Sequence, residues 1–422
     1  ADLQAAALFT LDAVANIVAG RNSGPGRKLL SWQKMMSTGS GGPIDKARLS
    51  FLYGSLCHIL EVDDLHRASV VHPGCIVVPA VFAMSAGSNG RSALTAILRG
   101  FEACCRVGMS VGPEHYRIWH NTATCGPFGS AMAVASLLQL DEASCVNALG
   151  NAGSQSSGLW QFLDTGAETK HLHAGRGAEA GVVAATLAKH GFTGAPEILE
   201  GDRGFYRATC PNPDERLLLP AEQEQWQLHA TSIKPWPSCR HTHPAIECAL
   251  ELHRQLPEGT AIKSVRVFAY PAALDLCDRE AVETAYAGKF SLQHCVATAL
   301  INGVVEFDSF EAAARTDARH LRSRTAVSAV EPFQSAYPVH WGSRVEVELE
   351  NGSVIAHQVA DARGDPELPL SHHDLVAKAR GLLVHGGHPA PDELIDQVLA
   401  MSGTGNVPDL SGLMVTADRG SS

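Results

Sequence analysis

The stretch "SIKPWPSCRHTHP", Ser232 to Pro244, separates two kinds of sequence in this 422-residue chain. Before it the sequence is rich in Ala, Leu and Gly, and apolar residues recur at helical spacing, as in the segment from Leu94 to Phe101. Prolines inside the stretch interrupt regular structure. The sequence therefore predicts a domain boundary close to Ile233, with an all-helical domain before it.

Beyond the boundary the pattern becomes mixed. The runs "IKSVRVFAY" (262–270) and "SRVEVELENGSVIAHQVADA" (343–362) alternate apolar and polar residues, and Asn351-Gly352 is typical of a hairpin turn. Helix-like runs at 289–303 and 315–327 separate these strands. We therefore expect a small, mainly antiparallel sheet rather than a series of βαβ units.

From Ser371 onward the pattern is helical again, which predicts that the chain returns to the first domain. The predicted fold is mainly α. Residues 1–233 and 371–422 form a large all-helical domain, and residues 234–370 form a smaller α+β lid domain inserted between them.

Composition excludes several classes of function. The net charge is −11 and no basic tract is present, so the chain is not expected to bind nucleic acid. The start "ADLQAAALFTLDAVANIVAG" contains Asp2 and Asp12 and lacks the basic region of a signal peptide, and no fully apolar run is as long as a membrane span. We expect a cytoplasmic protein away from membranes, with Ala1 marking a trimmed or incomplete start.

Cysteine and histidine patterns argue against metal centres. The 11 cysteines are odd in number, scattered and without a C-x-x-C pair, which fits a reducing compartment and no disulfide framework. The 20 histidines include no H-E-x-x-H, and pairs such as His171/His173 lack a third ligand at metal spacing. We therefore expect no metal.

The stretch "EVDDLHRASVVHPGC", Glu61 to Cys75, concentrates acids and histidines before the apolar run 76–80. A solvated charged loop is one interpretation of such a segment. A site for proton transfer is the other, because histidine titrates close to neutral pH.

Five motifs carry a resemblance to a known family. They are "EVDDLHRASVVHPGCIVVPAVFA" (61–83), "WHNTATCGPFGSAMAVASLLQLD" (119–141), "TKHLHAGRGAEAGVVAATLAKHGFTGAPEILEG" (169–201), "IKPWPSCRHTHPAIE" (233–247) and "KFSLQHCVATALINGVV" (289–305). In this order they resemble the MmgE/PrpD family of 2-methylcitrate dehydratases, cis-aconitate decarboxylase and iminodisuccinate epimerase. The resemblance implies a helical domain built from both chain ends, an inserted lid, a homodimer and catalysis without a metal or an organic cofactor.

The resemblance also implies a small di- or tricarboxylate substrate that loses a proton next to a carboxylate. Such chemistry needs a base with a pKa near the working pH and fixed positive charge for the carboxylates. His72, in the "HPG" motif just before an expected helix start, is the first choice for proton transfer, and His120 matches a second family histidine. A capping or surface role for His72 and a buried structural role for His120 are the alternatives.

Lysines and small polar groups are the candidates for binding the carboxylates of the substrate. Lys170 and Lys234 match the family's positions, and the loop from Thr122 to Gly126 offers a hydroxyl and backbone amides. Solvated lysines are the alternative, since that is the usual state of this residue.

The acids before His72 need another role, because carboxylates repel an anionic substrate. We expect Glu61 and Asp64 to orient the histidines, shuttle protons or pair with lysine. His66 is a further candidate lining residue, with a surface position as the alternative.

Two departures from the decarboxylase branch bear on the reaction. Leu65 stands where that branch has threonine, and His294 stands where it has tyrosine. His294 is a candidate substrate-binding residue, or else packs inside a lid helix. The departures favour a hydro-lyase resembling 2-methylcitrate dehydratase, with an epimerase or racemase next and a decarboxylase after it.

Other classes of protein fit less well. "GRGAEAG" is not the dinucleotide-binding G-x-G-x-x-G, and "GSQSSG" is not the hydrolase G-x-S-x-G. A non-enzymatic helical scaffold stays open. It predicts that the candidate residues lie far apart, whereas the enzyme requires them around one cleft.

Overall fold

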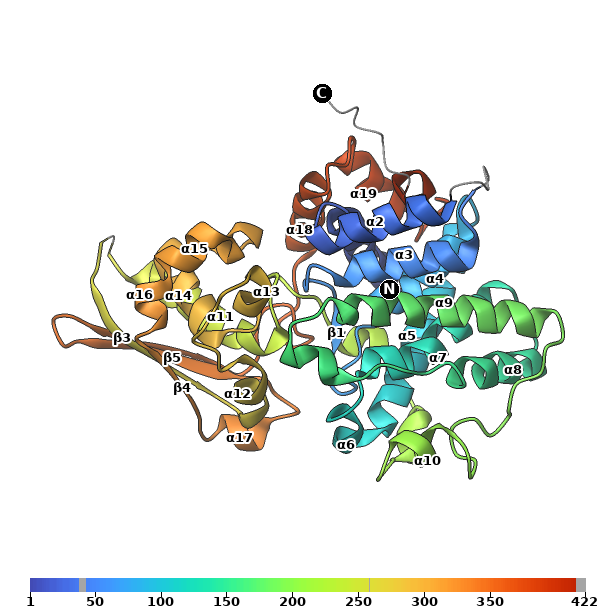
Figure 1. Cartoon of the computed structure of the whole chain (residues 1–422), viewed down its shortest axis with the longest axis horizontal. Coiled ribbons are helices and arrows are strands. Elements are labelled where there is room, and N and C mark those ends of the chain that lie inside the picture. Colours follow the sequence, from blue (N-terminus) through green and yellow to red (C-terminus); the bar gives the residue numbers. More distant parts are fainter. Residues whose placement is uncertain (38–42, 258, 415–422) are drawn as a thin grey trace. The chain divides into compact units, whose positions relative to one another are not determined.

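The computed structural model describes residues 1–37, 43–257 and 259–414. The chain forms two compact units, one from residues 1–231 with 371–422 and the other from residues 232–370 (Figure 1). We call them unit 1 and unit 2 and describe each by itself. Unit 1 is helical, and unit 2 combines helices with a sheet, so the predicted mainly α fold class is confirmed.

Unit 1 consists of helices and short 3₁₀ turns joined by loops. Its helices are α1 (Asp2–Gly20), α2 (Gly24–Ser37), α3 (Lys46–His58), α4 (Gly74–Ser85), α5 (Gly90–Ser110), α6 (Gly112–Tyr116), α7 (Asn121–Leu137), α8 (Glu142–Gly153), α9 (Thr169–Lys189), α10 (Phe205–Thr209), α18 (His372–His385) and α19 (Pro391–Ala400). The 3₁₀ turns are η1 (Trp160–Asp164), η2 (Glu215–Leu218), η3 (Gln227–Ala230) and η6 (Ser411–Met414).

The centre of unit 1 is a group of closely packed helices. α9 packs against α3, α7 and α8, and small residues permit this close approach. A Cβ at Gly181 of α9 would overlap Ser130 of α7, and the Ser130 hydroxyl donates to the Gly177 carbonyl at 2.7 Å. The core helices therefore hold the residues at their ends, including those that carry the candidate site, in fixed positions.

Helix α1 is long and apolar enough, by length and composition, to cross a membrane, contrary to the expectation from the sequence. Most of its apolar window is buried inside the protein, with Leu11, Val14 and Ile17 fully enclosed. Core helices of this length pass the same test, so α1 is weak evidence for a membrane span.

The C-terminal segment of unit 1 packs against its first helix. α18 lies against α1, and Lys378 of α18 reaches two partners with its ammonium group. One is the buried Asp12 carboxylate of α1 at 2.5 Å, and the other is the Val62 carbonyl at 2.7 Å. The returning chain therefore anchors the loop that follows α3.

Unit 2 contains a four-stranded sheet in the order β4-β3-β5-β6. The strands are β3 (Ile262–Ala269), β4 (Thr325–Ala329), β5 (Ser343–Leu349) and β6 (Val354–Val359). β3 pairs antiparallel with β5 and parallel with β4, and β5 pairs antiparallel with β6. The predicted small, mainly antiparallel sheet is confirmed. The hairpin turn at Asn351-Gly352 is confirmed as well, with Gly352 at φ 83°.

Helices cover this sheet and connect its strands (Figure 1). They are α11 (His243–Gln255), α12 (Pro271–Cys277), α13 (Ala285–Lys289), α14 (Leu292–Asn302), α15 (Ala312–Asp317), α16 (Arg319–Arg322) and α17 (Phe333–Ala336), with 3₁₀ turns η4 (Arg240–Thr242) and η5 (Phe307–Phe310). The helix-like run predicted at 315–327 was only partly right. It forms the short helices α15 and α16 and then enters β4, because Thr325 to Val327 pair with β3.

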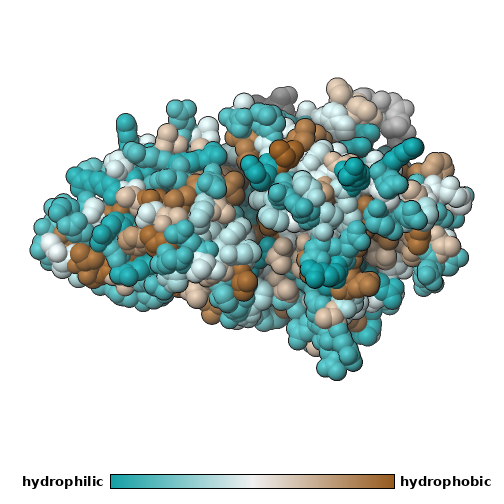
Figure 2. Space-filling view, turned by 90° about the horizontal axis from the view of Figure 1, so that it is seen from below, coloured by the Kyte–Doolittle hydropathy of each residue, from teal (hydrophilic) through white to brown (hydrophobic). Residues whose placement is uncertain are grey.

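Two short strands complete the secondary structure of the described residues, β1 (Leu65–His66) and β2 (Thr231–Ser232). Figure 2 shows one face of the molecule, on which apolar residues are scattered among polar ones. Scattered apolar residues are normal on protein surfaces and need no binding partner to explain them.

Candidate active site

The loop between α3 and α4 is buried, although it is rich in charge. Glu61, Asp63, Asp64 and His66 are at most 2% exposed, and His72 is 8% exposed. A solvated loop, one of the two interpretations of this segment, is therefore wrong. Buried ionisable groups must be paired, hydrogen-bonded or neutral, because burial disfavours the charged form.

Asp63 bridges two histidines. Its Oδ2 lies 2.7 Å from Nδ1 of His58, at the end of α3, and 3.4 Å from Nδ1 of His72. Burial alone would raise the pKa of this carboxyl, but the charges and hydrogen bonds of His58 and His72 outweigh it and hold the pKa well below its usual range. Asp63 is therefore ionised and fixes the orientation of both imidazoles.

His72 makes further contacts besides that with Asp63, and it directly precedes Pro73. Its Nδ1 lies 2.5 Å from the Asp64 carbonyl, its backbone N–H donates to Thr122 Oγ1 at 3.1 Å, and Pro73 directly precedes α4. The predicted helix start after Pro73 is confirmed. Residues 122–126 form the first turns of α7, so the expected loop there is wrong. Thr122 contacts the backbone of His72, while its proposed contact with substrate stays a prediction.

Asp64 caps the start of α4. Both of its carboxylate oxygens accept from the Gly74 backbone N–H at 3.0 Å. Glycine is needed there because a Cβ would lie 2.7 Å from the carboxylate. Burial, followed by repulsion from Asp63, raises the pKa of Asp64 well above its usual range. Asp64 therefore takes up protons more readily than an ordinary aspartate.

Glu61 and Lys170 form a buried ion pair. The Lys170 ammonium, in the first turn of α9, donates to both carboxylate oxygens of Glu61 at 2.7 and 2.6 Å. Lys170 is 5% exposed, so the solvated alternative for this lysine is wrong. Glu61 adopts a φ of 61°, a left-handed conformation that is uncommon outside glycine and is often found at functional sites.

His120 lies at the start of α7 beside a second imidazole. Its Nδ1 is 3.2 Å from Nδ1 of His173, which follows Lys170 on α9, and its ring packs on Trp160 with centroids 4.6 Å apart. Burial, followed by the charges of His58 and Lys170, lowers the pKa of His120 well below its usual value. His120 is therefore a neutral imidazole at physiological pH.

The histidines form one cluster. The His58 ring lies 4.7 Å from the His72 ring and 5.9 Å from the His120 ring, centroid to centroid. Within the described chain, the buried Nε2 atoms of His58 and His120 have no hydrogen-bond partner. A cavity of about 620 Å³ adjoins the cluster at His173 and is also lined by Ala123 and Gly158. The cluster thus has two imidazole nitrogens without a hydrogen-bond partner among the described residues and, through His173, adjoins a cavity.

His66 is buried rather than on the surface, so its surface alternative is wrong. Its Nδ1 lies 2.8 Å from Ser69 Oγ and its Nε2 lies 3.0 Å from Gln227 Oε1. Burial lowers the pKa of His66 to about 4. Both ring nitrogens are engaged within unit 1, and a role in substrate binding stays a prediction.

Lys234 and His294 belong to unit 2. Lys234 is 1% exposed, so the solvated alternative is wrong for it as well. His294 lies inside α14 with its Nε2 2.9 Å from the Ser309 carbonyl and its ring against Phe310. Burial is the main cause that lowers the pKa of His294 to about 4. Their roles in substrate binding stay predictions.

Sequence reasoning did not assign roles to Asp63, His58 and His173. Asp63 lies between Glu61 and Asp64 in the first motif, and nothing in the motif distinguishes its role from theirs. His173 was detectable, because it lies three residues after Lys170 on a helix and therefore shares a face with it. His58 ends α3, and its proximity to His72 depends on how the loop folds back.

Two sets of side chains in the described residues have the atoms of a metal site, the exposed or half-buried His340, Asp361 and Glu367 of unit 2 and one set beside the histidine cluster. His58, Asp63 and Cys75 place a nitrogen, an oxygen and a sulfur within 4.8 Å of one another. These atoms already serve other contacts, since His58 pairs with Asp63 and the Cys75 thiol donates to the His72 carbonyl at 3.2 Å. Burial raises the pKa of the Cys75 thiol well above its usual range. Metal binding requires the thiolate, so these residues fit a hydrogen-bonded network better than a metal centre.

Comparison with known proteins gives relatives of one kind. A cis-aconitate decarboxylase-like protein of Aspergillus oryzae is 26% identical over 79% of this chain and 74% of its own length. Cis-aconitate decarboxylase of Aspergillus terreus is 26% identical over 76% of this chain and 71% of its own. The human cis-aconitate decarboxylase is 23% identical over 78% of this chain and 71% of its own.

Family profiles cover nearly the whole chain. The MmgE/PrpD N-terminal domain matches residues 2–217, and the MmgE/PrpD C-terminal domain matches residues 236–401. The two matches follow one another in the order that the five sequence motifs indicate. The chain belongs to the MmgE/PrpD family.

Proposed function

We propose that this protein is a lyase that acts on a small di- or tricarboxylate, with imidazole groups of unit 1 moving a proton at the carbon next to a carboxylate. The observation that carries the proposal is the buried cluster of His58, His72 and His120, in which the Asp63 carboxylate bridges His58 and His72. The family relatives named as cis-aconitate decarboxylases, which are lyases for a tricarboxylate, support it.

The cluster is suited to take a proton from carbon. A base must be neutral before it acts, and burial lowers the pKa of His120 well below its usual value, which keeps that ring neutral. Nδ1 of His72 faces the Asp63 carboxylate and the Asp64 carbonyl, so proton transfer to or from substrate falls to its Nε2. The negative charge of Asp63 stabilises the imidazolium that forms when His72 accepts a proton.

The ion pair of Glu61 and Lys170 is a second observation in favour of an anionic substrate. Lys170 lies in the first turn of α9, three residues before His173. Glu61 keeps the ammonium oriented and charged in a buried place, and a substrate carboxylate would compete for the same donors. Lys234 and the homodimer remain part of the proposal on the strength of the family resemblance.

The finer proposal is loss of water. The base removes the proton, its bonding electrons form the carbon–carbon double bond, and the neighbouring hydroxyl leaves as water after protonation by an acid. Asp64 has a raised pKa and so holds a proton more readily than an ordinary aspartate, which makes it a donor candidate. Leu65 and His294, which differ from the decarboxylase branch, favour this reaction over decarboxylation.

Decarboxylation is the second candidate, because the relatives named above are cis-aconitate decarboxylases. In that reaction the carbon–carbon bond to a carboxylate breaks, and an acid must then donate a proton to carbon. A neutral imidazole is a weak acid for that step, so a charged form of His72 would have to supply the proton.

The test is incubation of the purified protein with a panel of di- and tricarboxylates in D₂O, followed by NMR. A new alkene identifies dehydration, carbon dioxide release identifies decarboxylation, and deuterium uptake without net product identifies epimerisation. Unchanged spectra for every acid, together with no thermal shift on adding them, would contradict the proposal and favour a scaffold.

A further inference from the structure

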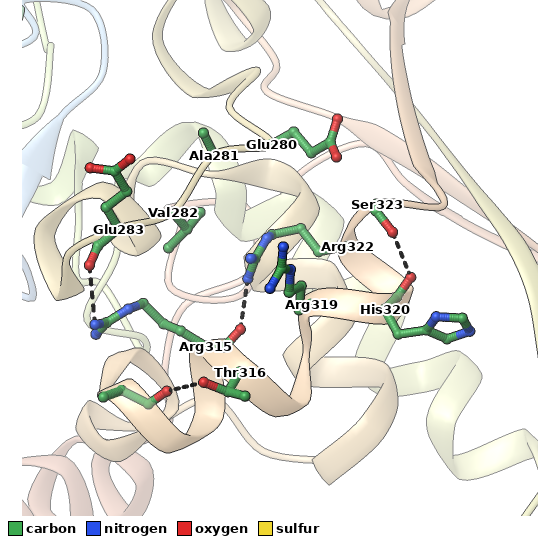
Figure 3. Close-up of a pocket in the computed structure, with 11 residues that line it drawn as sticks. Glu280, Ala281, Val282, Glu283, Arg315, Thr316, Arg319, His320, Arg322 and Ser323 are labelled. Carbon is green, nitrogen blue, oxygen red and sulfur yellow. Dashed lines mark hydrogen bonds between the residues drawn. The ribbon is translucent and has the colours of Figure 1, made fainter.

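Unit 2 contains a cavity of about 950 Å³ whose lining is rich in arginine (Figure 3). The basic residues are Arg315, Arg319, Arg322 and His320, and the acidic ones are Glu280 and Glu283. All lining residues lie between 280 and 323, within unit 2. The cavity therefore has an excess of fixed positive charge.

The arginines are oriented by carbonyl groups rather than by carboxylates. Arg322 donates to the Arg315 carbonyl at 2.9 Å, and Arg315 donates to the carbonyls of Phe310 and Glu283 at 2.7 and 3.2 Å. In the part of the chain that the structure describes, no carboxylate lies within 4.0 Å of any of the three guanidinium groups. The carbonyl contacts fix two guanidinium groups without neutralising them.

The charges repel one another at close range. Arg322 is only 8% exposed, and burial, followed by the charge of Arg319, lowers its pKa, with Arg315 acting in the same direction and Glu280 in the opposite one. In Figure 3 the guanidinium groups of Arg319 and Arg322 lie close together, while the carboxylate of Glu280 points away from them. Arginine stays charged under such conditions, so an anion in the cavity would relieve this repulsion.

We propose that this cavity binds a small molecule that carries phosphate groups. Guanidinium groups form paired hydrogen bonds with oxyanions, and the neighbouring groups of Arg319 and Arg322 can both donate to one phosphate, which has more acceptor oxygens than a carboxylate. A volume of about 950 Å³ exceeds the needs of one phosphate, so a diphosphate or its ester suits the cavity better. The apolar side chains of Ala281, Val282 and Ala312 line the rest of the cavity and suit the organic part of an ester.

The test uses calorimetric titration of the full-length protein with inorganic phosphate, pyrophosphate and citrate. Pyrophosphate is expected to bind saturably, more tightly than phosphate, and more weakly as salt rises, whereas citrate bound at the histidine cluster is expected to be unaffected by Arg319→Gln. Arg319→Gln is expected to weaken pyrophosphate about tenfold or more, the size of a lost hydrogen bond between charged groups. Arg319 is exposed, so this variant tests binding without removing a buried side chain.

Two further variants make the test specific. Arg254→Gln removes one positive charge from an exposed position of α11 that is paired with Glu251, and is expected to leave pyrophosphate binding unchanged. Glu280→Gln removes a negative charge from the cavity and is expected to tighten binding about threefold, as expected for an exposed charge interaction.

Three results would overturn the proposal. They are the absence of saturable pyrophosphate binding at low salt, an equal loss in Arg254→Gln and Arg319→Gln, and citrate binding that is both tighter than pyrophosphate binding and weakened by Arg319→Gln. The first removes the site, the second reduces it to general charge attraction, and the third removes phosphate as the ligand class.

Discussion

The histidine cluster of unit 1 and the arginine cavity of unit 2 differ in whether their charges are paired with opposite charges. In the cluster, Asp63 faces two imidazoles and Glu61 faces Lys170, all of them buried. In the cavity, guanidinium groups face one another and lack a carboxylate within ion-pair distance in the described residues. Buried charges of the cluster are paired with opposite charges, whereas the cavity keeps an excess of positive charge, part of it on the exposed Arg319. The charges of the cluster are thus paired without a ligand, and the cavity has a net attraction for an anion.

The largest effect is expected from removing the imidazole of His72, which is proposed to transfer the proton. His72→Ala should lower kcat by about a thousandfold, within the range for loss of a general acid or base. Steady-state assays on the substrate found by NMR measure this, with circular dichroism to check the fold. His190→Ala, at an exposed position after α9, is the control and should keep full activity. Near-normal turnover of His72→Ala would remove His72 from catalysis.

Breaking the buried ion pair of Glu61 and Lys170 tests whether each of these charges needs its partner for the protein to be stable. Glu61→Gln should reduce the free energy of unfolding by about 3 to 5 kcal/mol, because the Lys170 ammonium then stays buried without its carboxylate. Urea denaturation measures the change, and the exposed Glu222→Gln serves as the control. The double variant Glu61→Gln/Lys170→Met should recover much of the loss. A double variant no more stable than the single one would contradict the pairing.

Asp63→Asn tests the orientation of His72 and His58. The amide keeps the shape of the carboxylate but loses its charge, so kcat should fall by about 10- to 100-fold, as for other groups that orient a catalytic histidine. The acid limb of the pH–rate profile should also shift, which a purely structural loss would not cause. Asp202→Asn, at an exposed position, is the control. An unchanged profile would show that Asp63 does not act through the histidines.

The buried histidines predict how stability depends on pH. Burial is the main cause that lowers the pKa of His66, His115, His173 and His294 to about 4 and of His241 to about 3. The unfolded chain binds protons near pH 6.5, so it gains protons first as the pH falls, and stability decreases from pH 6.5 toward 4. Each fully buried histidine contributes about 1.4 kcal/mol per pH unit in that window. Urea midpoints equal at pH 7 and pH 5 would contradict this.

The smallest effect is expected in the cavity. Because Arg319 repels Arg322, Arg319→Gln should leave the free energy of unfolding unchanged or raise it by up to about 0.5 kcal/mol, the range of surface substitutions. This is the opposite sign to Glu61→Gln, and the same urea titration measures both. A loss of more than about 1 kcal/mol in the free energy of unfolding would mean that Arg319 has stabilising partners in the folded protein. That result would contradict the contrast between the cavity and the histidine cluster.

The fold was largely predictable, because it depends on local patterns. Helical spacing before Ser232, alternation at 262–270 and 343–362, and the Asn351-Gly352 turn all appear as predicted. The strand β4 that follows the short helices α15 and α16 was missed, since pairing with β3 decides the state of Thr325 to Val327 rather than their own sequence.

The sequence predicts which residues belong to the candidate site, but not which of them contact one another. The five motifs identified His72, His120, Glu61 and Lys170, and the structure brings these unit 1 residues into one buried region. The bridging role of Asp63 could not be read from the sequence, because it depends on the loop turning through the left-handed conformation at Glu61. Which acid orients a histidine is decided by such backbone geometry, whereas the motif only names the acids.

The contact between Lys378 and the Val62 carbonyl has a consequence for biosynthesis. A ribosome makes the loop around Val62 early, but the lysine that anchors it emerges only after more than three hundred further residues. The nascent chain therefore has to carry its clustered acids and imidazoles without this anchor until α18 has emerged. Catalytic competence should appear late in synthesis, after the inserted unit has already left the exit tunnel.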